Sequence, residues 1–229
     1  MDTTFAYQCL HHKTYAQYLR YETYKTAYVI HPIGAAIKEF GIVLDGCLKA
    51  EKYTVNGDDV FCAYFEDNDI FPEFLYFTGN KIYSYSLIAV KKTEVAWMPA
   101  SVFERMIQED HDMLYSFMLY IAHRGMKNQT LLNCLHYQTI HQRIAFWLLS
   151  MNNLSQDEHI PLPRSQTVWA NTLHVSRSSL NQELKHMENA GYFRIKGHVL
   201  ILLDQQALEQ TSVICRAAAY SGSSISLSR

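Results

Sequence analysis

The stretch Ser165–Glu188 constrains the fold most, because its pattern predicts two short helices joined by a tight corner. Trp169 and Leu173 lie four positions apart, which places them on one face of the first helix. His174 falls at the corner, where a positive φ is expected. The second helix has an N-cap at Ser176 and apolar positions at steps of four and three, namely Leu180, Leu184 and Met187. The stretch therefore predicts a helix-turn-helix.

The other face of the second helix carries donor-rich side chains: Arg177, Ser178, Asn181, Gln182 and Lys185. Arginine can donate two hydrogen bonds to guanine, and asparagine or glutamine can pair with adenine. Residues 191–203 then predict a strand, a turn at Lys196-Gly197 and a second strand. An ordinary solvated helix face is the alternative interpretation. A hairpin directly after two such helices favours a winged helix-turn-helix that binds the major groove.

The charge of the chain is unevenly distributed. The whole chain has a formal net charge of −2, whereas residues 160–203 contain five basic and two acidic residues, a net +3. The rest of the chain therefore carries about −5. A local basic face on an acidic protein is typical of a small DNA-binding module.

Several of these residues form a frame that resembles the DNA-binding end of the Crp/Fnr family of bacterial transcription regulators. The frame consists of Val175-Ser176-Arg177, Leu180, Leu184-Lys185, Met187-Glu188, Gly191-Tyr192 and the Lys196-Gly197 turn. The resemblance implies base contacts from Arg177, Ser178, Asn181 and Gln182, with Lys185 on the same face. It implies phosphate contacts from Ser165, Gln166, Ser176, Lys196 and His198. It also implies RNA polymerase as a partner.

The sequence departs from the family pattern at three positions. A corner that is often glycine is His174, a base-contacting position that is often glutamate is Ser178, and a usually apolar position inside the helix is Glu183. The first two departures indicate an operator that differs from the family's usual one.

Residues 36–99 predict short strands separated by hairpin turns at Asp45-Gly46 and Asn56-Gly57 and by a turn at Asp67–Asp69, with two more strands between 82 and 97. This spacing favours an antiparallel barrel or jelly roll and resembles the effector-binding β-roll of the same family. Residues 1–35 are expected to be irregular.

In cyclic-nucleotide-binding members of the family, a Gly-Glu-Leu loop and a following Arg-Ser or Arg-Thr pair hold the cyclic phosphate. Glu73 and Ser84 match this pattern, but Pro72 replaces the glycine and Tyr83 replaces the arginine. Because a buried phosphate needs a cation or an N–H cluster, we expect a non-nucleotide small-molecule effector. The residues expected to contact it are Phe71, Glu73, Phe74, Tyr76, Tyr83, Ser84 and Tyr85. The alternative is that these rings, and Phe77, simply pack the roll.

Residues 101–135 predict a short helix capped by Ser101 and a long helix that begins near Asp110–Asp112. The long helix has a heptad seam, at Leu114, Phe117, Ile121, Arg124, Asn128 and Leu131. We expect this seam to form a homodimer interface, to pack on its own β-roll, or to do both. A further helix is expected over 137–151.

Together these patterns predict an α+β fold: an N-terminal antiparallel, jelly-roll-like β-roll effector domain, a long dimerisation helix, and a C-terminal winged helix-turn-helix domain. The expected boundaries are 1–109, 110–135 and 136–220, followed by a tail at 221–229.

Other function classes find no support in the sequence. It has no nucleophile elbow, phosphate loop or H-E-x-x-H motif, and residues 36–99 contain no histidine, which argues against a cupin enzyme. The five cysteines are scattered, with only Cys9 near the N-terminus, so an iron–sulfur cluster is not expected. We expect no catalytic residues, no metal and no cofactor. The lack of a signal peptide or an apolar membrane span predicts a reduced, cytoplasmic chain.

The sequence therefore predicts a one-component regulator that responds to a small molecule and binds a palindromic double-stranded DNA operator as a homodimer. The alternative is a helix-turn-helix adaptor that binds a protein, or a ligand-binding module that does not bind DNA.

Overall fold

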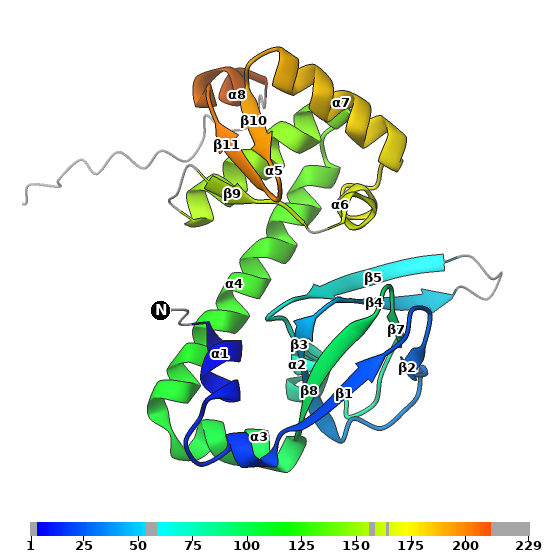
Figure 1. Cartoon of the computed structure of the whole chain (residues 1–229), viewed down its shortest axis with the longest axis vertical. Coiled ribbons are helices and arrows are strands. Elements are labelled where there is room, and N and C mark those ends of the chain that lie inside the picture. Colours follow the sequence, from blue (N-terminus) through cyan, green and yellow to red (C-terminus); the bar gives the residue numbers. More distant parts are fainter. Residues whose placement is uncertain (1–3, 54–58, 156–158, 164, 212–229) are drawn as a thin grey trace, which may run out of the picture. The chain divides into compact units, whose positions relative to one another are not determined.

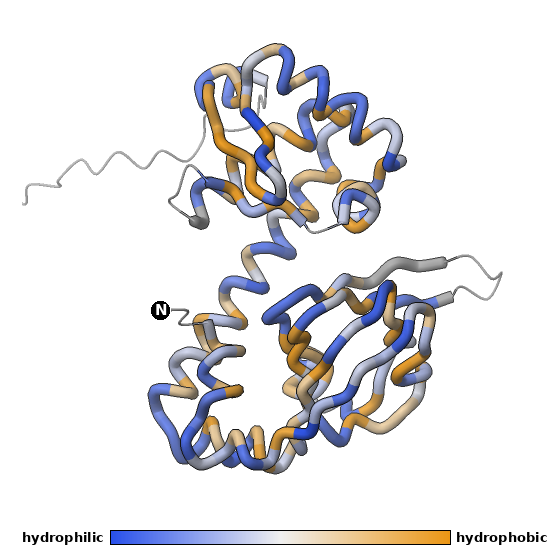
Figure 2. The backbone as a smooth tube through the Cα atoms, viewed as in Figure 1, coloured by the Kyte–Doolittle hydropathy of each residue, from blue (hydrophilic) through white to orange (hydrophobic). Residues whose placement is uncertain are grey.

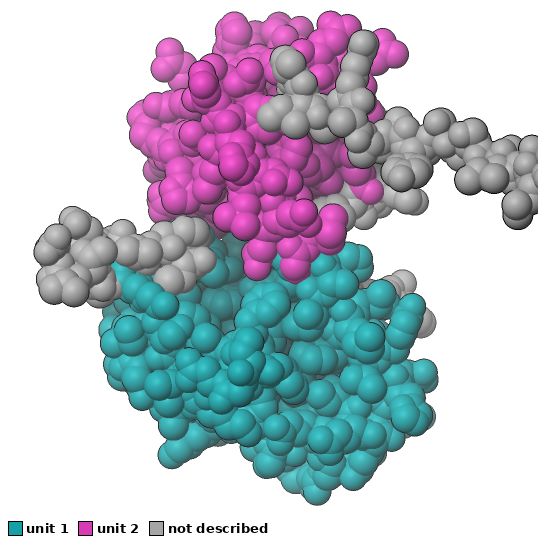
Figure 3. Space-filling model, turned by 180° about the vertical axis from the view of Figure 1, so that it is seen from behind, with its two compact units in different colours: residues 1–124 teal, residues 125–229 magenta. Residues whose placement is uncertain are grey.

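The computed structural model describes residues 4–53, 59–155, 159–163 and 165–211 (Figure 1). The chain divides into two compact units, residues 1–124 and 125–229 (Figure 3). It has the predicted α+β class, with antiparallel sheets in the N-terminal unit, a long helix, and a helix-turn-helix in the C-terminal unit. Among the described residues, no helix combines the length and the apolar character that a bilayer crossing requires. The predicted tail, 221–229, lies outside the described residues.

Two four-stranded antiparallel sheets form the body of the N-terminal unit. The first has the order β1 (Arg20–Tyr24), β8 (Thr93–Pro99), β3 (Glu39–Asp45), β6 (Ile70–Phe71). The second has the order β2 (Val29–His31), β7 (Ser86–Ala89), β4 (Cys47–Tyr53), β5 (Asp59–Glu66). The core is made of large apolar side chains from both sheets that are fully buried, including Phe40, Ile42, Leu48, Leu87, Trp97 and Met98. The predicted β-roll is confirmed.

The turn at Asp45-Gly46 is not the hairpin that the sequence predicts. It leads from β3 to β4, and these strands belong to different sheets. Gly46 has a φ of +127°, and a Cβ placed there would lie 2.4 Å from Thr93 Oγ1, so only glycine fits. The Asn56-Gly57 turn lies outside the described residues, whereas the turn at Asp67–Asp69 is confirmed, with Asn68 at a φ of +69°.

The N-terminal segment is more regular than predicted. It forms α1 (Phe5–Leu10), a 3₁₀ turn (Ala16–Tyr18), β1 and β2. Phe5 and Cys9 are buried, and the Phe5 ring lies 5.3 Å from the Phe117 ring. Because α1 spans only six residues, its stability comes from this packing rather than from helical periodicity.

Three helices complete the N-terminal unit or continue from it: α2 (Glu73–Phe77), α3 (Ala100–Glu109) and α4 (His111–Leu135). The prediction that Ser101 caps α3 is wrong, because the helix already begins at Ala100 and Pro99 occupies the cap position. The predicted start of α4 is confirmed. Asp110 Oδ1 accepts hydrogen bonds from the backbone N–H groups of Asp112 (2.9 Å) and Met113 (3.1 Å), which caps the helix.

The C-terminal unit contains α5 (Ile140–Ser155), α6 (Gln166–Thr172), α7 (Arg177–Asn189) and α8 (Gln205–Thr211). Its antiparallel sheet has the order β10 (Phe193–Lys196), β11 (Val199–Leu202), β9 (His159–Pro161). Strand β11 is hydrophobic throughout (orange in Figure 2). The hairpin of β10 and β11 is confirmed, while β9 and α8 were not predicted. The helix expected from Tyr137 begins at Ile140, after a cap in which Thr139 Oγ1 accepts from Gln142 N–H.

The side chains predicted to be inward-facing in the helix-turn-helix are buried. They are Trp169, Leu173, Leu180, Leu184 and Met187. The Trp169 ring packs against Trp147 of α5, with 5.0 Å between the ring centroids. This core fixes α6 and α7 on α5 and leaves the polar side of α7 outward.

Candidate functional site

The corner between α6 and α7 has the predicted geometry. His174 has a φ of +52°, and Ser176 caps α7 by accepting a hydrogen bond from Ser179 N–H at 3.0 Å. The guanidinium of Arg143 in α5 holds this corner, donating to the carbonyls of Leu173 (2.9 Å) and Tyr137 (2.9 Å). Sequence patterns gave no sign of this role for Arg143, because its partner Leu173 is 30 residues away and no local motif marks the contact.

Four of the five predicted side chains on the outer face of α7 are exposed: Arg177, Ser178, Gln182 and Lys185. Most of α7 is hydrophilic (blue in Figure 2). The fifth, Asn181, is half-buried, and its Oδ1 is buried without a hydrogen-bond partner among the described residues. The helix therefore presents a donor-rich surface to solvent.

A groove of 440 Å³ lies beside this surface. Its lining includes Ser165 and Gln166 at the start of α6, Arg177 at the start of α7, and Gly197 and His198 in the turn between β10 and β11. The structure thus brings one predicted base contact and three predicted phosphate contacts into a single groove. Lys196, the preceding wing residue, is exposed.

The two acidic residues of α7 are both engaged within the domain. Glu188 Oε1 accepts a hydrogen bond from Ile195 N–H at 2.8 Å, which ties α7 to β10. Glu183 Oε1 lies 2.6 Å from His141 Nδ1 of α5. Because these carboxylates have partners inside the unit, they oppose a phosphate backbone less than free carboxylates would.

The residues predicted to contact an effector lie mainly inside the N-terminal core. Phe71, Tyr76, Tyr83 and Tyr85 are buried, Ser84 is half-buried and Phe74 is exposed. The Tyr83 ring stacks on His31 with 4.6 Å between centroids. Burial raises the pKa of the Tyr83 hydroxyl, which has no hydrogen-bond partner among the described residues. Tyr83 is therefore a buried, protonated donor.

Glu73 is fully buried beside Arg124 of α4. Arg124 Nε lies 3.5 Å from Glu73 Oε1, which is too far for a well-formed hydrogen bond. Arg124 Nη1 lies 3.2 Å from Asp69 Oδ1. Burial raises the pKa of Glu73 to about 7, against the opposing effect of the Arg124 charge. The guanidinium next to Glu73 is thus already hydrogen-bonded to Asp69, while its Nε lies near Glu73 without a hydrogen bond among the described residues.

The heptad seam that was expected to form a homodimer interface packs largely within its own chain. Packing within the chain was the alternative that the sequence left open. Phe117 is buried against Phe5 and Phe103, Arg124 pairs as described, and Ile121 and Leu131 are half-buried in their units. Leu114 and Asn128 are exposed. A parallel row is more exposed and again follows steps of three and four: Tyr115, Met118, Ala122, Gly125, Gln129 and Leu132. This row is called the outer seam.

The described free cysteines are not reactive thiols. Cys9, Cys47 and Cys134 are buried. Burial raises the pKa of both Cys47 and Cys134 to about 12, so their thiols stay protonated at neutral pH.

Comparisons with known proteins agree with both units. The model of the cyclic nucleotide-binding domain matches residues 21–110, and the model of the Crp-like helix-turn-helix domain matches residues 142–211. Among curated proteins, none has a sequence that matches this chain.

Solved structures share the fold at low identity. A mutant of CooA from Carboxydothermus hydrogenoformans is 16% identical, with a TM-score of 0.67 over 93% of this chain and 97% of the other. FixK2 from Bradyrhizobium japonicum is 17% identical, with a TM-score of 0.62 over 84% and 96%. The c-di-GMP-responsive global regulator CLP from Xanthomonas campestris is 15% identical, with a TM-score of 0.54 over 82% and 95%. With the two domain models in this order on one sequence, the chain belongs to the Crp/Fnr family of transcription regulators.

Proposed function

We propose that the chain is a ligand-responsive transcription regulator that works as a homodimer on a palindromic DNA operator. The observation that carries DNA binding is the exposed, donor-rich face of α7 beside the groove formed with α6 and the wing. A helix of this kind fits the major groove, and two copies related by a two-fold axis contact half-sites about 34 Å apart.

The contacts divide into two classes. Arg177, Ser178, Asn181 and Gln182 contact base edges, with Lys185 farther along the same face. Ser165, Gln166, Ser176, Lys196 and His198 contact phosphates. Phosphate contacts set the register and base contacts set the sequence preference, so substitutions in the two classes have different effects.

The effector is a non-nucleotide small molecule that binds in the β-roll near Phe71, Glu73, Phe74, Tyr76, Tyr83, Ser84 and Tyr85. Two observations support this. The guanidinium nearest to Glu73, that of Arg124, is hydrogen-bonded to Asp69 and is therefore not free to hold a phosphate. The buried Tyr83 hydroxyl is available to a polar group on an otherwise apolar ligand.

The homodimer forms along the outer seam of α4. Tyr115, Met118 and Leu132 are 63%, 60% and 64% exposed. Apolar side chains at heptad spacing pack well in a two-helix seam. Effector binding shifts the population toward the dimer that fits the operator, provided that this form binds the effector more tightly. RNA polymerase is the further partner that family membership suggests.

The proposal is tested by selecting duplexes from a random DNA library with the purified chain. The affinity of the chain for the most enriched duplex is then measured at two salt concentrations. We expect an enriched palindrome whose affinity falls steeply as salt rises, because phosphate contacts release counterions. A lack of enrichment, with no salt-dependent binding to any duplex, would favour the protein–protein adaptor.

A further inference from the structure

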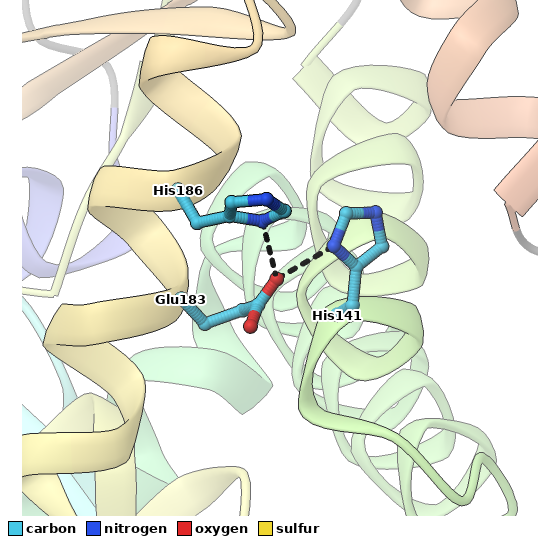
Figure 4. A group of neighbouring side chains, drawn as sticks. All are labelled: His141, Glu183 and His186. Atoms are coloured by element: carbon cyan, nitrogen blue, oxygen red, sulfur yellow. Dashed lines mark hydrogen bonds and ion pairs between the residues drawn. The ribbon is translucent and has the colours of Figure 1, made fainter.

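Three potential metal ligands converge inside the C-terminal unit, where the sequence shows no metal motif. His141 belongs to the first turn of α5, while Glu183 and His186 lie one turn apart on α7. Glu183 Oε1 lies 2.6 Å from His141 Nδ1 and 3.4 Å from His186 Nδ1. The ligand atoms of all three residues lie within 4.8 Å of one another. Figure 4 shows the glutamate between the two imidazole rings.

The donor set and spacing suit a divalent transition metal. Zinc binds imidazole nitrogen and carboxylate oxygen at about 2.1 Å, so tetrahedral ligand atoms lie about 3.4 Å apart. The separation between Glu183 Oε1 and His186 Nδ1 equals this value at 3.4 Å, whereas the separation between Glu183 Oε1 and His141 Nδ1 is shorter at 2.6 Å and must widen when an ion binds. Two nitrogens and one oxygen favour zinc, cobalt or nickel over magnesium and calcium, which prefer oxygen ligands alone. Three protein ligands also leave a fourth position for water.

Two of the three ligands are held in place by their surroundings. The His141 ring meets Tyr192 edge-on, with 5.5 Å between centroids, and Glu183 is fixed on the side of α7 that carries Leu180, Leu184 and Met187. The His186 side chain is 71% exposed, so it can rotate and adjust the distance of its ring nitrogen from the other two ligand atoms. Little ordering is needed for binding, which favours affinity.

We propose that His141, Glu183 and His186 form a binding site for a divalent transition metal of the zinc type, which fastens α7 to α5. In the metal-free form the carboxylate can only accept, so each ring Nδ1 is the donor. Coordination through Nδ1 moves the proton of each neutral ring to Nε2, so no net proton is released. The site also accounts for Glu183, an acidic residue at a helix position that is usually apolar in the family.

The ion has a consequence for DNA binding that rests on the proposed function. The helix that the ion fastens is the one that carries Arg177 and Gln182, so an occupied site holds the contact surface in one orientation. Ordering this helix before binding lowers the entropic cost of the complex. Metal therefore raises operator affinity.

The metal site is tested on the untagged full-length chain after treatment with a chelator. Co²⁺ is titrated and followed by its visible absorption, and Zn²⁺ is then added to displace it. We expect saturation at one ion per chain. Glu183→Gln keeps a hydrogen-bond acceptor but removes the carboxylate, and His186→Ala changes an exposed side chain. Each substitution lowers metal affinity at least about tenfold, because even the loss of a residue that only hydrogen-bonds to a metal ligand reduces affinity by about that factor. His111→Ala, at an exposed position in α4, is the matched control and binds as the wild type does.

The proposal is overturned if binding is not saturable, or if Glu183→Gln and His186→Ala bind metal as tightly as the wild type. Thermal melts of the metal-free variants check folding, and His186→Ala gives the answer if Glu183→Gln does not fold. Operator binding is then measured with and without Zn²⁺. One ion bound with unchanged operator affinity refutes the consequence for DNA alone. If the chain binds one ion but no duplex, the proposed function is refuted and the metal site is still supported.

Discussion

Arg124 of α4 and Asp69 of the turn before β6 form an ion pair, with 3.2 Å between Nη1 and Oδ1. Only 13% of the Arg124 side chain is exposed, and its guanidinium also lies beside Glu73. The helix that leaves the β-roll is thus fastened to the turn that contains Asp69, and it lies beside Glu73, one of the residues proposed to contact the effector. A ligand that contacts Glu73 would therefore act on the side chain beside which Arg124 of α4 is held.

The Glu73 carboxyl makes stability depend on pH. Its pKa is raised from 4.5 to about 7 in the folded chain, so the neutral form stabilises the fold. This stabilisation is fully present below about pH 4.5 and is lost as pH rises to about 7, a total of about 3 kcal/mol. Glu73→Gln removes the dependence because the amide does not ionise. The measurement is the free energy of unfolding from pH 4.5 to 7.5 for both chains.

The exposed Glu94 of β8 provides the control, since Glu94→Gln should leave the pH profile of the wild type unchanged. The difference between the wild-type and Glu73→Gln profiles isolates the one carboxyl. If that difference is flat across the window, Glu73 does not titrate as described.

Local patterns predicted the helix-turn-helix well because its signals lie within a few residues. The cap at Ser176, the corner at His174 and the stripe from Leu180 to Met187 each depend on neighbours in the sequence. Strand β9 was not predicted because it has only three residues and because its partner strand, β11, lies about 40 positions later in the sequence. The hairpin assigned to Asp45-Gly46 failed for the same reason, since the sheet that each strand joins is decided by distant partners.

Contacts between residues far apart in the sequence were also missed at the candidate metal site. Glu183 looked out of place in the sequence, and its partner His141 is 42 residues away. Periodicity also could not choose between the two seams of α4, because both follow steps of three and four. Tertiary packing distinguishes them, because it buries Phe117 and Arg124 of the first seam in the N-terminal unit and leaves most of the outer seam exposed.

Arg143 is expected to stabilise the helix-turn-helix without contacting DNA. Arg143→Ala removes charged hydrogen bonds to the Leu173 and Tyr137 carbonyls and lowers the free energy of unfolding of the C-terminal unit by about 3 kcal/mol. The measurement is chemical denaturation followed by tryptophan fluorescence, in which Trp147 and Trp169 report on the C-terminal unit and Trp97 on the N-terminal unit. The control is Arg194→Ala, at an exposed position in β10. A surface change of this kind should alter stability by about 0.5 kcal/mol at most. Equal stability of the two variants would contradict the role given to Arg143.

The outer seam of α4 predicts the effect of a charge on assembly. Leu132→Glu places an unpaired carboxylate in the seam and costs about 3 kcal/mol, a rise of about 100-fold in the dimer dissociation constant. Analytical ultracentrifugation over a concentration series measures this constant. Lys127→Glu changes an exposed residue on the opposite side of α4 and should leave assembly intact. A dimer that tolerates Leu132→Glu but not Lys127→Glu would move the interface to the other side of the helix.

The two classes of DNA contact predict two different mutant phenotypes. Arg177, at the first turn of α7, is the residue that we propose to contact a base edge. Arg177→Ala should therefore cost about 1–3 kcal/mol on the selected operator while relaxing preference at one base pair. Lys196, in the wing, is assigned to a phosphate, so Lys196→Ala should weaken binding equally on every sequence and reduce the salt slope by about 1. Binding to the operator and to its single-base variants, each at several salt concentrations, separates the two. If Arg177→Ala instead weakens all duplexes equally, Arg177 is a phosphate contact, and sequence recognition must lie with Ser178, Asn181 and Gln182.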